Sequence, residues 1–511
     1  MSLQSNNNKR IAKNTLLLYF RMLFMMVVSL YTSRVILNAL GVEDFGIYNV
    51  VGGVVAMFSV ISGSLSAAIS RFITYELGKG DQSKLNKIFS ASVTIQLLLS
   101  LIIVVLIESV GVWFLNAKMT IPAERMTAAN WVLQFSIVTF VIGLISVPYN
   151  AAIIAHEKMS AFAYISILEA VGKLAIAFLI MVSPMDRLIF YAILMCVVGL
   201  IVRFTYGHYC KKHFAECTYH FHWDKTLLKT MSGFAGWQFF GTGSYMLMTQ
   251  GVNILLNFFF GPIVNAARGV AVQVDGVVQQ FVNNFTTAIN PQITKSYAAG
   301  NKEYMFQLIY SGAKYSFFLV LFFAVPIMLE ANYILELWLK NVPEHTYSFL
   351  RLIVAIDLLY VLSNTMMTAM TATGDIKKYQ IIVGGTGMLV FPIAWVCFYL
   401  GLPAETAFII QFLIFVVQLI YRIFLLHQMI GLPIWEFVQK VIVKSVVVAL
   451  FAFVIPTCFH YILPFGEFIR LVVVCIVSVI STILSIYVFG LSMPEKIFIK
   501  DKIKNKIKHE N

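Results

Sequence analysis

Unbroken apolar runs of about 20 residues recur along almost all of the 511-residue chain, and this pattern restricts the possible folds more than any other feature. A run of this length is what an α-helix needs to cross the hydrocarbon core of a bilayer. The runs do not alternate with a period of two, as lipid-facing strands of a barrel would. Only 12% of the residues are charged, which is too few to cover the surface of a soluble domain. The sequence therefore predicts an all-α polytopic membrane protein.

We place about fourteen transmembrane helices along the chain, each near the length that the bilayer requires. Their expected ranges are 14–39, 46–70, 88–114, 129–153, 161–182, 187–206, 232–258, 263–289, 309–330, 346–371, 380–400, 404–427, 440–463 and 467–490. The first run is too long for a signal-peptide core, so we expect it to be retained. All loops between the spans are short. Binding and chemistry are therefore expected between the helices.

Basic residues are distributed unequally between alternate loops. One set of loops and span ends holds most of them, including Lys9, Arg10, Lys13, Lys79, Lys84, Lys87, Lys158, Lys211, Lys212, Lys295, Lys302, Lys377, Lys378 and the lysines of the tail. The other set holds only Lys118, Arg125, Arg187, Lys340 and Arg470. Excess Lys and Arg marks cytoplasmic loops, so we predict that both termini are cytoplasmic. This topology explains the net charge of +13, and no nucleic-acid partner is expected.

The chain also repeats itself. A shift of 220 residues places Leu40-Gly41-Val42 on Phe260-Gly261-Pro262 and Gly80 on Gly300, and a shift of 217 places Ala152 and Ala155 on Ala369 and Ala372. Each repeat holds six spans, an even number, so the two halves share one orientation. We therefore predict an N-terminal six-helix bundle at 1–206, a cytoplasmic linker at 207–231, a C-terminal six-helix bundle at 232–427, and two additional spans with a basic tail at 428–511. Two such bundles predict a central cleft and alternating access.

Ionisable side chains inside spans are costly, so they usually face a partner or a water-filled cavity. Glu108, Arg203, Lys314 and Arg422 lie near span ends, where we expect them to reach the interface. The remaining ones are Arg21 and Arg34 in the first span, Glu169 and Lys173 in the fifth, Arg268 and Asp275 in the eighth, and Arg351 and Asp357 in the tenth.

Spacing groups some of these charges on shared helix faces. Glu169 and Lys173 are four residues apart, which suits either a self-neutralising pair or a functional one. Arg268 and Asp275 are seven apart and share a face two turns apart. Their helix also carries Asn265 and Gln273, so it is too polar to face lipid all round. A cavity lining is favoured over a hydrogen-bonded seam between bundles.

Arg21 is the cation that is hardest to explain by position. It lies roughly 10 Å into the membrane at 1.5 Å per residue, whereas Arg34 and Arg351 are close enough to a span end to reach the interface. The planar guanidinium suits phosphate oxygens, so such a cation predicts an anionic substrate group. No phosphate-binding loop and no nucleophile–base motif is found, so we expect a transporter without a cofactor and without a catalytic site.

One loop carries zinc-ligand residue types. It contains His208, Cys210, His213, Cys217, His220 and His222. The spacing matches no standard zinc site, so a polar amphipathic linker is favoured and no metal is predicted.

Several stretches resemble the Wzx-type polysaccharide flippases, which translocate O-antigen and capsule precursors and belong to the multidrug/oligosaccharidyl-lipid/polysaccharide (MOP) exporter superfamily. These stretches are SRVILNALGVEDFGIYNVV, SAAISRFITYELGKGD, AHEKMSAFAYISILEAVGK and TATGDIKKY. The resemblance covers essentially the whole chain. It implies a MATE-like fold in a bacterial inner membrane and the movement of an undecaprenyl-pyrophosphate-linked oligosaccharide from the cytoplasmic to the periplasmic leaflet.

The resemblance also implies roles for particular residues. Arg21, Arg34 and Arg268 become candidate contacts for pyrophosphate or sugar acids, and Lys173 joins them by its depth, with Asn265 and Gln273 on the same cavity. Asp275, Glu169 and Asp357 become candidates for coupling to H⁺ or Na⁺. Besides this substrate and the membrane lipids no partner is implied. The fold needs no oligomer, so we expect a monomer, and a place near the glycan polymerase machinery would suit it.

Three alternatives stay open. A MATE-type drug or cation antiporter needs acidic residues in its cavity, and the first span has none. A lipid II flippase has the same chemistry, so the sequence does not exclude it. A membrane O-antigen polymerase or ligase typically carries a large periplasmic loop, which this chain lacks.

Overall fold

The structure is a computed structural model that describes residues 2–56, 58–117, 119, 121–221, 223–339, 342–462, 466–497 and 500. The described residues are almost entirely helical, and they contain no strand. Eleven segments among them are long and apolar enough to cross a membrane, judged by length and composition. Of the other predicted spans, 232–258 and 263–289 lie in one long helix, whereas 46–70 is divided between two helices that end at Ala56 and begin at Ser59. The predicted all-α fold class is confirmed. Lys118, Lys340, His222 and the tail lysines after Lys500 lie outside the described residues.

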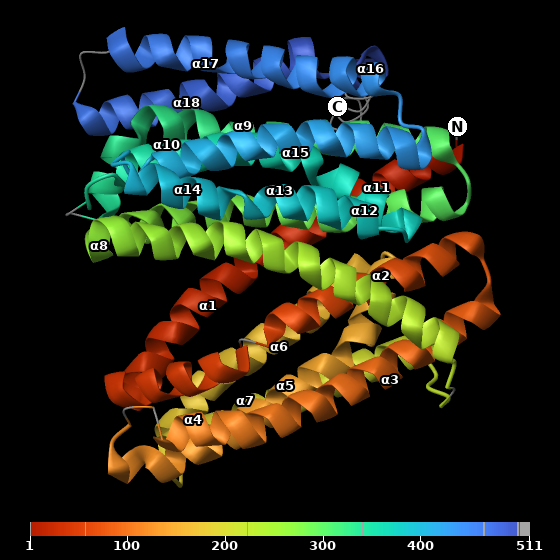
Figure 1. Ribbon diagram of the computed structural model, residues 1–511, viewed down its shortest axis with the longest axis vertical. Helices are drawn as coiled ribbons and strands as arrows, with labels where there is room; N and C mark the ends of the chain where they lie inside the picture. The colour runs from red at the N-terminus through yellow and green to blue at the C-terminus, as the bar shows by residue number, and fades with distance from the viewer. Residues whose placement is uncertain are drawn as a thin grey trace, which may run out of the picture. The chain divides into compact units, whose positions relative to one another are not determined.

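The chain forms two compact units, of which unit 1 comprises residues 1–242 and 287–301. Its elements are α1 (Ser2–Ala56), α2 (Ser59–Lys79), α3 (Gln82–Leu106), η1 (Ile107–Gly111), α4 (Val112–Ala117), η2 (Ala123–Arg125), α5 (Met126–Ala155), α6 (Met159–Leu179), η3 (Ile180–Val182), α7 (Arg187–His213) and both ends of α8 (Lys225–Ala298). The long helix α5 contacts α7, α2, α1 and α3, and α6 packs against α1 (Figure 1).

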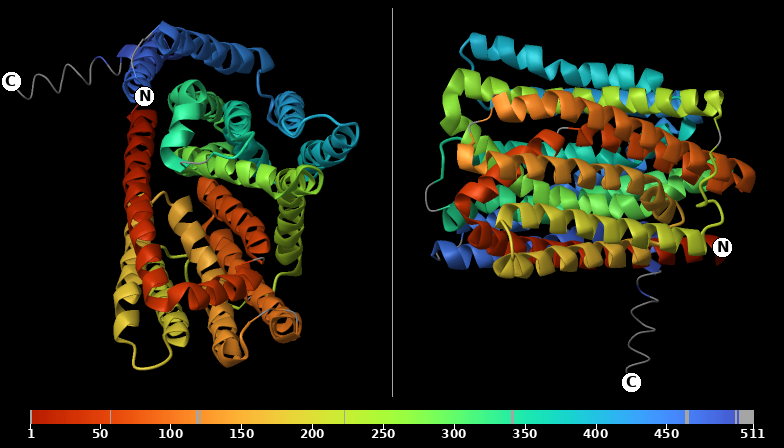
Figure 2. Two further views of the ribbon diagram at one scale, coloured as in Figure 1. Left: turned by 90° about the vertical axis from the view of Figure 1, so that its left-hand side faces the viewer. Right: turned by 90° about the horizontal axis from the view of Figure 1, so that it is seen from below.

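Unit 2 comprises residues 243–286 and 302–511. Its elements are the middle of α8, α9 (Lys302–Leu339), α10 (Thr346–Tyr360), η4 (Val361–Ser363), α11 (Asn364–Thr373), α12 (Lys377–Tyr379), η5 (Gln380–Gly384), α13 (Gly385–Met388), α14 (Val390–Tyr399), α15 (Thr406–Ile430), α16 (Ile434–Phe437), η6 (Val438–Val443), α17 (Lys444–Ile462), α18 (Glu467–Ser485) and η7 (Ile486–Gly490). The predicted additional spans, α17 and α18, lie side by side and both contact α9 (Figure 2). The predicted domain bounds, with a cytoplasmic linker at 207–231 and two additional spans with a basic tail at 428–511, stay a prediction.

The internal repeat is visible in the backbone. Gly41 interrupts α1 at φ 82°, ψ 167°, and Gly261 interrupts α8 at φ 82°, ψ −176°. Gly80 and Gly300 also correspond, with φ values of 77° and 74°. These are conformations that a side chain disfavours, so the glycines recur at equivalent turns because the backbone needs them there.

Charged side chains near span ends do not all reach the interface. Lys314 is only 5% exposed and its Nζ lies 3.0 Å from a carboxylate oxygen of Glu495. Arg422 is 4% exposed and donates to Ser363 and Gln418. The expectation that both side chains extend to the membrane surface was therefore wrong, because each has a polar partner inside the protein.

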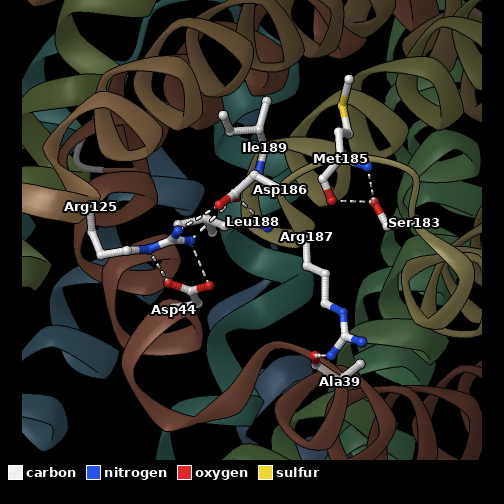
Figure 3. Close-up of polar contacts among 9 residues, drawn as sticks. All are labelled: Ala39, Asp44, Arg125, Ser183, Met185, Asp186, Arg187, Leu188 and Ile189. Atoms are coloured by element: carbon white, nitrogen blue, oxygen red, sulfur yellow. Dashed lines mark hydrogen bonds and ion pairs between the residues drawn. The ribbon is translucent and has the colours of Figure 1, made fainter.

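A cluster of ion pairs just before the start of α5 connects three turns of unit 1 (Figure 3). Arg125 donates from Nε to Asp44 at 2.8 Å and from Nη1 to Asp186, so its guanidinium bridges two carboxylates. Asp186 also caps α7 by accepting from the amides of Leu188 and Ile189. Burial raises the pKa of Asp186, but these donors lower it more, and the net pKa lies below its ordinary value. The carboxylate is therefore charged at neutral pH, and through Arg125 it connects the start of α7 to Asp44, three residues after Gly41.

The two glycine turns provide a test of the repeat. No atom lies within 4 Å of a Cβ added at Gly41 or Gly261, so alanine there would meet only backbone strain. We expect Gly41→Ala and Gly261→Ala each to lower the free energy of unfolding by about 1–3 kcal/mol. Thermal unfolding in detergent measures this loss.

Matched controls lie in the same helices. Gly46 in α1 and Gly269 in α8 also have open space around an added Cβ, but their backbones are helical. Gly46→Ala and Gly269→Ala should be neutral or slightly stabilising, because alanine is the better helix former. Equal melting temperatures for the turn variants and the controls would contradict the interpretation.

Candidate functional site

Polar groups at membrane depth gather in two clusters, one in each unit. In unit 1, Arg21 on α1 places its guanidinium carbon 4.3 Å from the ring centroid of Phe162 on α6. Tyr206 on α7 and Glu169 on α6 are close enough to interact with it electrostatically. The Nε of Arg21 is buried and has no hydrogen-bond partner among the described residues. The cluster therefore offers an incompletely bonded cation beside an aromatic face.

The neighbouring charges of α6 pair with one another. Lys173 Nζ lies 2.6 Å from Glu169 Oε1, and both side chains are about 39% exposed. Lys173 therefore contributes little net positive charge as long as Glu169 stays ionised. Within the described part of unit 1, Arg21 is the better candidate to meet an anionic group at this depth.

In unit 2, the structure brings two predicted coupling residues together. Asp275 on α8 and Asp357 on α10 lie with their carboxyl groups in hydrogen-bonding contact. Gln279, one turn after Asp275, donates from Nε2 to Asp357 Oδ1 at 2.8 Å. Asp275 Oδ1 and Asp357 Oδ2 are buried and find no donor among the described residues. Two carboxylates in contact cannot both stay ionised without help, so the pair fits a shared proton or a bound cation.

Arg268 lies two turns before Asp275 on the same face of α8, as its spacing predicted. Its side chain donates from Nη1 to Asn253 at 3.1 Å and from Nη2 to the Thr249 carbonyl at 2.9 Å, while its Nε has no partner among the described residues. Tyr245 interacts electrostatically with Arg268 and with both aspartates. Arg268 is therefore held in place by neutral groups, on the same helix face as Asp275.

The other predicted residues are less closely associated. Asn265 has a buried Oδ1 without a described partner, and Gln273 is exposed on a different face of α8 from Asp275. Arg34 lies on α1, but its side chain is outside the described residues. In the linker, the thiols of Cys210 and Cys217 contact each other. No group of three metal-ligand side chains was found in the described part of the chain.

Sequence reasoning did not single out Tyr245, Asn253 or Gln279 as part of a site. Gln279 had a local signal, since it follows Asp275 by four residues on one helix face. Asn253 and Arg268 lie eight and seven residues on either side of the Gly261 turn. Residues at similar distances on the two sides of a turn can meet across it, so the glycine could have indicated this contact. Nothing local indicates that Asp357 reaches Asp275.

Two sequence comparisons match about half of the chain. The sequence profile of the family described as "Polysaccharide biosynthesis protein" matches residues 11–297. The uncharacterized membrane protein EpsK of Bacillus subtilis (strain 168) is 21% identical over 287 residues, which cover 54% of this chain. The match spans about half (55%) of the length of EpsK.

Several solved structures share the fold. An outward-facing multidrug resistance MATE family transporter of the MOP superfamily aligns with a TM-score of 0.70 and 13% identity, covering 81% of this chain and 94% of its own. A MATE protein in the bent conformation aligns with a TM-score of 0.72 and 13% identity, covering 83% and 96%. A MOP superfamily transporter from Pyrococcus furiosus, reported to have a binding pocket of reverse polarity, aligns with a TM-score of 0.68 and 14% identity, covering 84% and 96%. These likenesses confirm the predicted MOP fold.

The carboxyl pair predicts a response to ions. Raising the pH in sodium-free buffer removes the shared proton and leaves two like charges in contact, so we expect the melting temperature to fall. If the pair binds Na⁺, added Na⁺ should raise the melting temperature again. At a Na⁺ concentration of 100 times the Kd, binding adds about 2.7 kcal/mol to the free energy of unfolding. In Asp357→Asn the new amide can donate a hydrogen bond to Asp275. The melting temperature of this variant should therefore no longer depend on pH or on Na⁺ through this pair. Thermal unfolding in detergent over pH 6–9, with and without Na⁺, is the measurement.

Asp375→Asn is the matched control, because Asp375 is an exposed aspartate of the same unit. It should keep the wild-type response. A wild-type protein that responds to neither ion, or an Asp357→Asn variant that still responds, would show that the pair is not an ion site.

Proposed function

The chain belongs to the polysaccharide biosynthesis protein family and has the fold of MOP superfamily transporters, and from this premise we propose that it is a lipid-linked oligosaccharide flippase. Its substrate is an undecaprenyl-pyrophosphate-linked glycan, which it moves from the cytoplasmic to the periplasmic leaflet by alternating access. The substrate combines an anionic pyrophosphate, a polar sugar and a long hydrocarbon tail. A path between helices can hold the first two while the tail stays in lipid.

The observation that carries this proposal is the incompletely bonded Arg21. A cation inside a span is costly unless it has a partner, and the half-buried Arg21 keeps a buried Nε without a hydrogen bond beside the ring of Phe162. A diphosphate offers several oxygens that suit the guanidinium fork. An apolar face beside the cation also suits a sugar ring. Arg268 in unit 2 is a second candidate for the same substrate.

Energy for the cycle comes from H⁺ or Na⁺ in this proposal, because no phosphate-binding loop is present in the sequence. Asp275 and Asp357 are the coupling residues. An ion that bridges two buried carboxyl groups binds one arrangement of α8 and α10 better than another. Only such a difference in affinity lets an ion gradient shift a conformational equilibrium.

The proposed membrane is the cytoplasmic membrane of a bacterium, with both termini in the cytoplasm, as the distribution of Lys and Arg favours. The protein acts as a monomer and no enzymatic step is assigned to it. A drug or cation antiporter is the second candidate, and the acidic pair in unit 2 favours it, since carboxylates can hold an organic cation. The cationic Arg21 in unit 1 favours the flippase.

Deletion of the chain from its own organism tests the proposal directly. We expect an undecaprenyl-linked oligosaccharide to accumulate on the cytoplasmic side while surface glycan disappears, because polymerisation follows the flip. Analysis of lipid-linked glycans in both leaflets is the measurement, and the trapped sugar identifies the substrate. An unpolymerised intermediate in the periplasm would point to an enzyme instead. Unchanged glycans with increased sensitivity to cationic drugs would favour the antiporter.

Substitution of Arg21 tests the anion contact. A hydrogen bond between a charged pair contributes about 1.5–3 kcal/mol, so Arg21→Gln should lower flipping roughly 10- to 100-fold at equal protein level. Arg21→Lys keeps the charge but loses the fork, and an intermediate loss is expected. The flipping of lipid-linked glycan in reconstituted vesicles measures both variants.

Arg203→Gln is the control for these variants. Arg203 of unit 1 also lies over an aromatic ring, that of Tyr149, with 3.9 Å between guanidinium carbon and ring centroid. It should flip at the wild-type rate. Wild-type flipping by Arg21→Gln would remove Arg21 from the substrate path.

A further inference from the structure

The turn between α5 and α6 contains an acidic residue in an unusual backbone conformation. Glu157 has φ 57°, in the left-handed region that side chains disfavour. At a shift of 217 residues the second repeat has Gly374, with φ 84°, which is free of that strain. A glutamate at this position costs conformational energy, so its side chain must contribute something that glycine does not.

The carboxylate of Glu157 is completely buried and bonded on all sides. Gln292 donates from Nε2 to both carboxylate oxygens at 2.8 and 2.7 Å. Lys295 Nζ lies 2.8 Å from one of these oxygens and Arg10 Nε lies 2.9 Å from the other. Asn14 donates to the backbone carbonyl of Glu157 at 3.2 Å. We name these five residues the Glu157 cluster.

The donors come from both repeats. Arg10 and Asn14 lie at the start of α1, but Gln292 and Lys295 lie in the last turns of α8, whose second half is the repeat counterpart of the span that ends at Lys79. Residues 287–301 nevertheless belong to unit 1, whereas residues 243–286 of the same helix belong to unit 2. The Glu157 cluster therefore fastens a helix of the second repeat to the first repeat.

The backbones meet closely at the same place. A Cβ added at Gly78 of α2 would lie 2.8 Å from Lys295 Cα and from Ala298 Cβ, so only glycine allows this approach. The rings of Tyr75 and Tyr297 also pack together, with centroids 6.2 Å apart. The contact between α2 and the end of α8 is thus tight, and the charged cluster lies beside it.

We propose that the Glu157 cluster is the latch that keeps the transporter closed on the face where Arg10 and Lys295 lie, and that the latch opens whenever substrate enters from that face. The proposal rests on the alternating access of the proposed function, in which this face is cytoplasmic. Alternating access requires contacts between repeats that form and break on one face. A buried carboxylate with several donors is stable when all are in place and unstable when some leave, so the contact has two discrete states.

Only one such latch is expected, because the two repeats differ at this turn. Gly374 has no side chain, so the equivalent turn of the second repeat cannot make the same contact. Loss of Glu157 should therefore leave no substitute on this face.

Cross-linking tests the latch without reference to any substrate. Cysteines at Tyr75 and Tyr297, introduced together in a background without the six native cysteines, should be joined efficiently in membranes by a short bis(methanethiosulfonate) cross-linker, which spans the space that the two rings occupy. Glu157→Gln should lower the yield several-fold, because the loss of charge releases Lys295 and Arg10. Gln292→Ala leaves the ion pairs in place and is less disruptive to folding, so it should lower the yield to a smaller extent.

Glu216→Gln is the matched control. Glu216 is also buried, and its partners Gln82 and His156 both lie in the first repeat. Its substitution removes a buried charge near the same turn without affecting the contact between repeats. The cross-linking yield should stay at the wild-type level.

The outcomes separate the latch from the proposed function. If Glu157→Gln and Gln292→Ala both cross-link like the wild type while eluting as folded monomers, the latch is refuted, whatever the cargo. If cross-linking falls as expected but deletion of the chain traps no glycan, the latch stands and the flippase proposal fails. With Glu157 intact, the cross-link should also stop transport, and reduction of its two disulfide bonds should restore it. Undiminished transport by the cross-linked protein would overturn the proposal.

Discussion

Inside a bilayer no water is available to a charged group, so every charge must find its partners within the protein. This constraint explains how the last two spans are attached. Glu330 in α9 is 1% exposed and binds His460 of α17 and Arg470 of α18. Towards the other end of α9, Lys314 pairs with Glu495, which follows α18. Two buried ion clusters thus hold α17 and α18 along α9, and their groups are bonded within the protein.

Other polar clusters inside the protein lack some of their hydrogen-bond partners. Arg21 in unit 1 and the carboxyl pair of Asp275 and Asp357 in unit 2 each keep a buried polar atom without a partner among the described residues. Such atoms are destabilising unless a ligand or an ion completes them. Unit 1 thus offers a cation, and unit 2 offers the acidic pair together with Arg268, whose Nε also has no partner among the described residues. A transporter that moves an anion at the expense of a cation gradient needs both.

The sequence alone predicts the features that the bilayer requires and the side-chain contacts between residues a few helical turns apart. Helical spans follow from apolar length, the two glycine turns follow from the repeat, and the pairing of Glu169 with Lys173 follows from spacing. The interior roles of Lys314 and Arg422 were misjudged because position along a span does not show which helix lies next to it. Glu495 is 181 residues from Lys314, and Lys295 is 138 residues from Glu157. Contacts at such separations depend on tertiary packing, which one sequence does not determine.

The helix α8 connects these features. After the turn at Gly261 its next interruption is its end at Ala298, so Asp275 and Lys295 lie on one continuous helix. Twenty residues separate them, about 30 Å at 1.5 Å per residue. If both proposals hold, a shift of this helix at Asp275 would also displace Lys295, since no break in the helix separates the two residues. Release of the Glu157 carboxylate from its donors would need a compensating gain in free energy. An ion that completes the acidic pair would supply such a gain on the same helix. The proposed ion site and the proposed latch would then share one helix, and coupling between them requires that this helix have two states whose equilibrium both sites bias.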